Sequence, residues 1–177
     1  MPLALTREAV GAVADLLRAE LTNRTSAVTV DVGRPESAAG GAGPKFNLFL
    51  YQVDIDGHLR NRALDKGQPP PLWLVLRYLL TSFDSAGESD TIDAQRLLGE
   101  GLLAVQSLNF IHPTAGSLLD NPEPLKITFE PADAELLSKI MQGNNERYRM
   151  SVGFQVRPVM LTFTSPASQA PLVQTVG

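Results

Sequence analysis

The sequence contains no cysteine and only two histidines in 177 residues. The absence of cysteine excludes disulfides, thiolate nucleophiles, zinc–thiolate sites and iron–sulfur clusters. His58 and His112 stand far apart in the sequence, so a transition-metal site is not expected, and neither a metal nor another cofactor is predicted. No apolar run approaches the roughly 18 residues that a bilayer-spanning helix needs, so direct insertion into a membrane is not expected.

Charged residues are also scarce, at 19% of the chain, and the formal net charge is −4. A negative balance weighs against binding to nucleic acid. A sheet-based RNA-binding module is further disfavoured because the aromatic pattern on which such modules stack bases is missing. The start of the chain lacks a basic stretch followed by a long apolar core, so a signal peptide is not expected and a cytoplasmic location is predicted.

A hydrophobic content of 44% over 177 residues suffices for one globular domain. We place this domain at residues 1–164. The remaining residues, 165–177, are rich in Ser, Pro and Ala and predict an irregular C-terminal tail.

Motifs for catalysis are missing. The segment 39–45 has a faint resemblance to a phosphate-binding loop, which needs Gly-Lys-Ser/Thr between a strand and a helix. Here Pro44 separates Gly43 from Lys45, and Phe46 replaces the hydroxyl residue, so a flexible connection is the better interpretation. No nucleophile elbow occurs either, and the sequence predicts no enzyme. The alternative is an enzyme or nucleotide-binding protein of unrecognised type that uses the glycine-rich loop 39–45.

Hydrophobic periodicity predicts about three helices and about five strands. The helices are expected over 6–22, over 91–108, and from Pro131 to a stop at Gly143. The strands are expected over 28–32, 45–55, 72–80, 125–130 and 148–157. These elements predict a single-domain α+β fold with a mostly antiparallel or mixed sheet.

Some elements carry more detailed predictions. The strand 45–55 is apolar on both faces, which favours a central position in the sheet. Periodicity leaves 72–80 as strand or buried helix, and its aromatic and β-branched residues favour strand. The last strand is expected to bend at Pro158, because proline cannot donate to the ladder.

Two local signals concern turns and caps. The segment 35–44 is rich in Gly, Ala and Ser, which is typical of a loop. Asp90 with Asp93 resembles a capping box and predicts that Asp90 caps the helix that follows.

Arg60 and Arg62 flank Asn61 directly after a turn predicted at Asp56-Gly57. One interpretation is a solvated loop. The other is an interface with an acidic protein partner, because arginine is enriched at interfaces and forms bidentate hydrogen bonds with carboxylates. In an extended segment both guanidinium groups would point to one side, about 7 Å apart.

Five blocks in fixed order resemble the cap protein of contractile injection systems, which have an inner tube, a contractile sheath and a baseplate. The blocks are FNLFLYQVDIDGHLRNRAL, PPPLWLVLRYLLTSFD, DAQRLLGEGLLAVQSLNFI, PEPLKITFEPADAELLSKIM and YRMSVGFQVRPVML. The resemblance runs from about Leu5 to Phe163. The family is similar to the tail terminators of contractile-tailed phages, which are α+β proteins that form hexameric rings.

This resemblance implies a structural cap that terminates tube and sheath at the end distal to the baseplate. It implies three partners: further copies of the chain in a homohexamer, the inner tube protein and the sheath protein. The implied location is the cytoplasm within an assembled particle, with release by lysis left open. The candidate interface residues are Arg60, Asn61, Arg62, Arg149 and Arg157.

Overall fold

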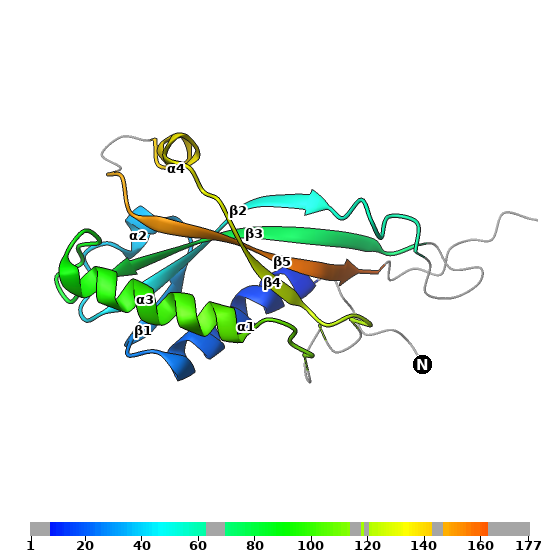
Figure 1. The fold of residues 1–177 in the computed structure, drawn as a ribbon, viewed down its shortest axis with the longest axis horizontal. Coiled ribbons are helices and arrows are strands. Elements are labelled where there is room, and N and C mark those ends of the chain that lie inside the picture. The colour runs from blue at the N-terminus through cyan, green and yellow to red at the C-terminus, as the bar shows by residue number, and fades with distance from the viewer. Residues whose placement is uncertain (1–7, 63–69, 114–117, 119–120, 143–146, 163–177) are drawn as a thin grey trace, which may run out of the picture.

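The fold is a five-stranded mixed sheet with helices on both faces (Figure 1). The computed structural model describes residues 8–62, 70–113, 118, 121–142 and 147–162. The elements in chain order are α1 (Ala9–Arg24), β1 (Thr29–Val32), α2 (Pro35–Ala38), β2 (Lys45–Ile55), β3 (Leu72–Phe83), α3 (Ile92–Ser107), β4 (Lys126–Glu130), α4 (Ala134–Ile140) and β5 (Ser151–Leu161). The strand order is β1-β2-β3-β5-β4. Only β1 and β2 pair in parallel, so the predicted α+β fold with a mostly antiparallel or mixed sheet is confirmed.

The main core lies between one face of the sheet and the helices α1 and α3, and we call this face the inner face (Figure 1). Alternate residues of β3 point into this core, and Tyr78 stacks on Phe154 of β5 with ring centroids 5.6 Å apart. The opposite, outer face carries a smaller apolar cluster in which Leu137 and Met141, at α4, pack on Leu79 of β3. β3 is therefore buried on both faces, and the prediction of a strand over 72–80 is confirmed.

The central position predicted for the strand 45–55 is wrong, because β3 occupies the centre of the sheet. β2 is a strand over the predicted range, but β1 pairs with only its first four residues, Lys45–Leu48. Beyond them the apolar residues are not covered on both faces: Val53 is 48% exposed and Ile55 52%. Apolar alternation therefore identified the strand but not its neighbours.

Two local predictions fail. The segment 35–44 is not all loop, because Pro35–Ala38 form the short helix α2, in which Pro35 stands at the favourable start of the helix. The N-cap of α3 is Thr91 rather than Asp90, since the Thr91 hydroxyl accepts a hydrogen bond from the backbone N–H of Ala94. The cap therefore lies one residue later than the box pattern indicated.

β5 begins at Ser151, later than predicted, and continues through Pro158 to Leu161. The expected bend takes the form of a register shift against β3, between Leu74 and Leu76. Asn121 compensates for the interrupted ladder: its side-chain amide donates to the Pro158 carbonyl (3.0 Å), and its oxygen accepts from the Met160 N–H (2.9 Å). The strand can therefore pass a proline without leaving these backbone groups unpaired.

The other boundaries lie close to the predicted ones. α1 extends to Arg24, and the predicted start at residue 6 lies outside the described residues, as do Gly143 and the proposed boundary between 164 and 165. Among the helices that the structure describes, none combines the length and the apolar character needed to cross a bilayer.

Gly101 sets the distance between α3 and the sheet. A Cβ added there would lie 2.7 Å from Cε1 of Phe46, whereas one added at Gly99 of the same helix would meet nothing within 4 Å. We expect Gly101→Ala to lower the free energy of unfolding by about 1–3 kcal/mol, because a rigid ring must move. Gly99→Ala is the matched control and should raise it by up to about 1 kcal/mol through helix propensity. Urea denaturation measures both, and equal stabilisation by the two variants would contradict the close packing.

Candidate functional site

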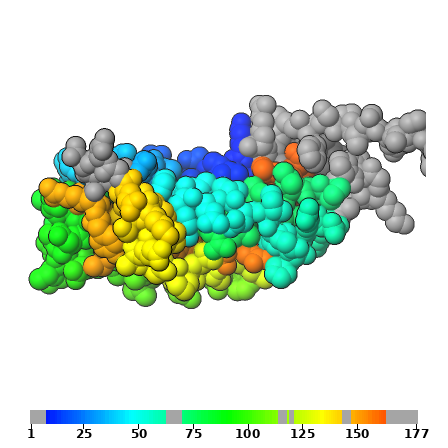
Figure 2. All heavy atoms as spheres, turned by 90° about the horizontal axis from the view of Figure 1, so that it is seen from above, coloured from blue at the N-terminus to red at the C-terminus, as the bar shows by residue number. Residues whose placement is uncertain are grey.

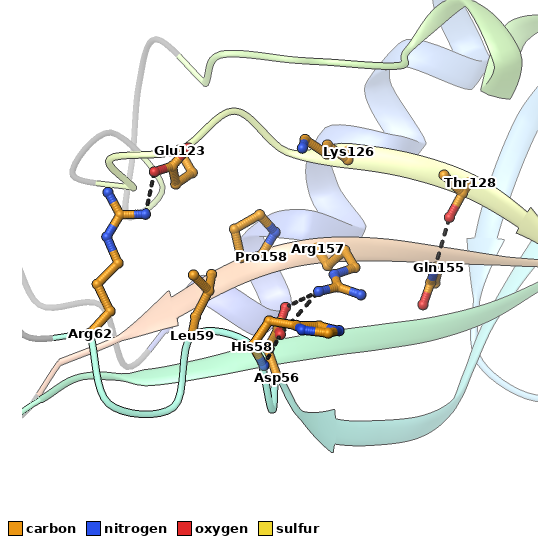
Figure 3. A pocket seen from close by; sticks show the side chains of 10 residues that line it. All are labelled: Asp56, His58, Leu59, Arg62, Glu123, Lys126, Thr128, Gln155, Arg157 and Pro158. Carbon is orange, nitrogen blue, oxygen red and sulfur yellow. Dashed lines mark hydrogen bonds and ion pairs between the residues drawn. The ribbon is translucent and has the colours of Figure 1, made fainter.

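On the outer face α4, yellow in Figure 2, lies toward one end of the sheet and covers the smaller apolar cluster, whereas polar residues gather toward the other end. A groove of about 420 Å³ lies at the polar end, between the turn after β2 and the strands β4 and β5 (Figure 3). It is lined by Asp56, His58, Leu59, Arg62, Glu123, Lys126, Thr128, Gln155, Arg157 and Pro158. The groove brings two of the predicted interface residues, Arg62 and Arg157, to one place.

Asp56 anchors the floor of the groove. Its carboxylate is buried and lies against Arg157, with Nη2 at 3.0 Å from Oδ1 and 2.8 Å from Oδ2. Oδ1 also accepts the backbone N–H of His58 at 3.0 Å, and the Asp56 N–H donates to the Trp73 carbonyl at 2.7 Å. Arg157 thus pairs with an internal carboxylate, while its side chain stays 31% exposed and lines the groove.

Arg62 closes the groove on the other side. Its guanidinium pairs with Glu123 (Figure 3), and the two side chains are 49% and 36% exposed. An exposed pair of this kind contributes at most about 1 kcal/mol to stability. Arg62 can therefore exchange Glu123 for another carboxylate at little cost.

Arg60 and Asn61 line a second groove of about 630 Å³ together with Ile55, Gly57, Pro70, Pro71, Leu72 and Trp73. The extended segment predicted for Arg60 and Arg62 is wrong, because residues 57–61 form turns. The Leu59 N–H donates to the Asp56 carbonyl, and the Arg62 N–H donates to the Leu59 carbonyl. As a result the two arginines line different grooves. Arg60 is exposed and forms no ion pair with any residue that the structure describes.

Arg149 lies away from both grooves, just before the start of β5. Its side chain is only 6% exposed and lies between Glu36 (3.5 Å) and Glu88 (3.4 Å). The guanidinium also stands 5.5 Å from the ring centroid of Phe83. These contacts join α2 and the turn before α3 to β5. The interface roles of Arg60, Asn61, Arg62, Arg149 and Arg157 stay predictions.

A row of charges crosses the middle of the outer face. Arg77 of β3 donates from Nε to Asp54 of β2 at 2.7 Å and pairs through Nη1 with Glu130 of β4. The hydrogen bond from Arg77, assisted by Gln52, holds the pKa of Asp54 below its usual value. Burial is the main cause of the raised pKa of Tyr51 beside this row. Arg77 was not predicted as a site residue, although a single charge within LWLVLRYLL was a usable signal.

The glycine-rich loop does not present its lysine to a ligand. Lys45 is 7% exposed, with Nζ 3.3 Å from Oδ2 of Asp31. The loop passes so close that a Cβ at Gly41 would lie 2.2 Å from Nζ. The loop leads into β2 and not into a helix, so the helix N-terminus on which a phosphate loop depends is missing there. Among the described residues, no group of three or more His, Asp and Glu side chains could hold a metal ion.

Residues 9–175 match the family model of the Pvc16 N-terminal domain. No curated protein matches the chain. One solved structure with a similar fold is the sheath/tube terminator of PVC, an extracellular contractile injection system, in its extended state. Its TM-score is 0.60 at 20% identity, and the match covers 97% of this chain and 61% of that chain. The tube-terminating cap of the anti-feeding prophage has a TM-score of 0.61 at 17% identity, covering 95% of this chain and 59% of that one. The chain thus spans less than two thirds of either relative, and at these identities the likeness establishes the fold.

The Asp56–Arg157 pair should matter for folding, whereas Arg60 should not. Arg157→Gln leaves a buried carboxylate without its cation, and we expect the free energy of unfolding to fall by about 1–3 kcal/mol. Arg60→Gln is the matched control and should change it by less than about 0.5 kcal/mol. Urea denaturation of both variants measures the difference. Equal effects would show that Arg157 does not hold Asp56 in place.

The lowered pKa of Asp54 predicts a pH dependence of stability. Its carboxylate stabilises the fold fully above the unfolded-state pKa of about 4, and this contribution is lost as the pH falls through the lower folded-state value. We therefore expect Asp54→Asn to lose less stability than the wild type between about pH 5 and pH 2. Denaturation midpoints across this range provide the measurement. Parallel curves for the two proteins would contradict the role of Arg77 in lowering the pKa.

Proposed function

The chain belongs to the Pvc16 N-terminal domain family, and on this ground we propose that it caps a contractile injection system. The cap terminates the inner tube and the sheath at the end distal to the baseplate. The observation that carries the proposal is the family match over residues 9–175, together with a fold shared with a sheath/tube terminator and a tube-terminating cap. The partners that follow are the inner tube protein, the sheath protein and further copies of the chain.

In this proposal the cap is a homohexameric ring. A closed ring with cyclic symmetry can match the six-fold tube that the family resemblance implies, and each subunit then meets one copy of the tube and sheath subunits. The ring is complete on the particle, and the free chain need not be hexameric, because the tube end supplies a template. Assembly takes place in the cytoplasm within the particle.

The described residues give further support to a structural role. The charged residues of the groove around Asp56 engage one another, as in Asp56–Arg157 and Arg62–Glu123, and they do not form a nucleophile with a base beside it. We therefore propose no catalytic turnover. Arg60, with Asn61, is left as the exposed cationic position beside an apolar groove, which suits a carboxylate on a neighbouring protein.

The test is particle assembly with altered caps. Particles made without this chain should carry over-long or frayed tubes. Arg60→Glu with Arg62→Glu should give the same defect while the melting temperature changes by no more than a few degrees, because both side chains are exposed. Cryo-EM of purified particles measures tube length and the cap density.

A charge exchange separates partner contact from internal pairing. Arg62→Glu combined with Glu123→Arg restores the internal ion pair but moves the positive charge to the other side of the groove. If Arg62 contacts the tube or the sheath, this variant should still cap poorly. Normal particle length with the first double variant would mean that the arginines are solvated surface. Normal length in particles that lack the chain would overturn the proposed cap function.

A further inference from the structure

The sheet has two open edges on opposite sides. On one side β1 pairs with β2 only as far as Leu48, so no strand of the described part of the chain pairs with Tyr51–Ile55 on that edge. On the other side, within the residues that the structure describes, β4 pairs only with β5, and the isolated bridge from Ile111 ends at Leu125, just before β4 begins. The part of β2 beyond its pairing with β1, residues 49–55, is long enough to take the five residues of β4.

The free edge of β2 lacks the usual protection against pairing. Proteins block exposed edges with lysine, proline or bulges, and Tyr51–Ile55 contains neither lysine nor proline. Its register shift lies at its start, between Leu50 and Gln52, so the stretch beyond is regular. Val53 and Ile55 are about half exposed, at 48% and 52%. Beyond the register shift, residues 52–55 are regular and alternate apolar with polar side chains, with Asp54 as their one charge, and such an edge can serve as a template for another strand.

We propose that β4 of a second copy of the chain adds to the Tyr51–Ile55 edge of β2, so that the sheet continues from one subunit to the next. The inference rests on the proposed homohexameric ring, and it identifies the contact between neighbouring subunits of that ring. Among the described strands the outer edge of the four-residue β1 stays unpaired, but one head-to-tail contact, repeated by rotation, pairs both of these open edges in every subunit. A strand from an unrelated protein would cover only one of them.

The direction of this pairing follows from the topology. β2 is antiparallel to β3, β3 to β5 and β5 to β4, so β2 and β4 run in opposite directions within one subunit. Rotation about an axis along the strands preserves strand direction. The β4 of the next subunit therefore arrives antiparallel to β2.

Side chains on both faces match in this arrangement. Val53 and Phe129 point to the inner face, since they pair with Leu76 and Phe154 of the main core. Phe129 is 40% exposed, so placing it opposite Val53 buries apolar surface on both strands.

The charged residues on the outer face favour one of the two possible strand directions. With Val53 opposite Phe129 in the antiparallel direction, Thr128 lies opposite Asp54, and Lys126 and Glu130 lie on the two diagonals, at about 7–8 Å. In the parallel direction the same pair would place Glu130 directly opposite Asp54, where like charges repel. Charge therefore agrees with topology on the antiparallel pairing.

The absence of cysteine makes a direct test possible. Directly opposed antiparallel residues have Cα atoms about 4.5–5.5 Å apart, which lies within the range for a disulfide. Particles that carry Val53→Cys with Phe129→Cys are oxidised and separated on a non-reducing gel. The expected result is a ladder of linked subunits that ends at six.

The control moves one cysteine along the same side of the sheet. Val32→Cys with Phe129→Cys uses a valine of β1 that is 52% exposed, close to the 48% of Val53, and should give no ladder. Each single-cysteine variant should stay monomeric on the gel, because the contact joins different surfaces.

A second variant tests the contact without oxidation. Val53→Lys with Ile55→Lys adds the charges that natural edges carry, at positions that are half exposed. The free chain should melt within a few degrees of the wild type, and the cap density should be lost from the particles.

The outcomes separate the two proposals. A ladder confined to the Val53–Phe129 pair, with loss of the cap in the lysine variant, supports strand addition. Capped particles without that ladder, an equal ladder from the Val32 control, or a normal cap in the lysine variant overturns it and leaves the cap function standing. Wild-type particles that do not contain the chain overturn both.

Discussion

The three long strands of this sheet, β2, β3 and β5, extend beyond the helices α1 and α3 that cover its inner face. α1 and α3 have 16 residues each and span about 24 Å, whereas β2, β3 and β5 have 11 or 12 residues and span about 36–40 Å. The helices pack on the end of β2 that includes Phe46, where Gly101 permits close approach. At the far end of β2, Val53 and Ile55 are about half exposed. The grooves, the turn after β2 and the free edge all lie toward this end.

At the uncovered end, polar residues take the place of an apolar layer, and they are paired with one another. Arg77 holds Asp54 and Glu130, and Arg157 holds Asp56. Paired charges of alternating sign contribute little net attraction to a partner, but they penalise a wrong one, because displaced charges must find new partners. This end of the sheet therefore suits selective contact within an ordered assembly better than tight binding of a free ligand.

Much of the fold could be predicted from the sequence, because apolar alternation and helical spacing report which side chains are buried. All five strands and three of the four helices lie close to the predicted ranges. What failed depends in part on contacts between distant segments, since alternation in β2 could not show that β1 stops at Leu48. The turn predicted at Asp56-Gly57 is present, but the x-R-x-R spacing could not show that the turns continue through Asn61. The candidate site was predicted only in part for the same reason. Arg157 and Asp56 lie 101 residues apart, and their pairing has no local signal.

α4 gives the molecule a region whose stability differs from that of the core. It has seven residues, buries only Leu137 along its length, and rests on a small cluster separate from the main one. Detaching it exposes little apolar surface and breaks no pairing within the sheet, so its amide protons can exchange with solvent through local opening. Those of β3, paired on both sides and buried on both faces, exchange only when the whole domain unfolds. The outer face thus consists of a stable sheet and the helix α4, which can detach by local unfolding while the sheet stays paired.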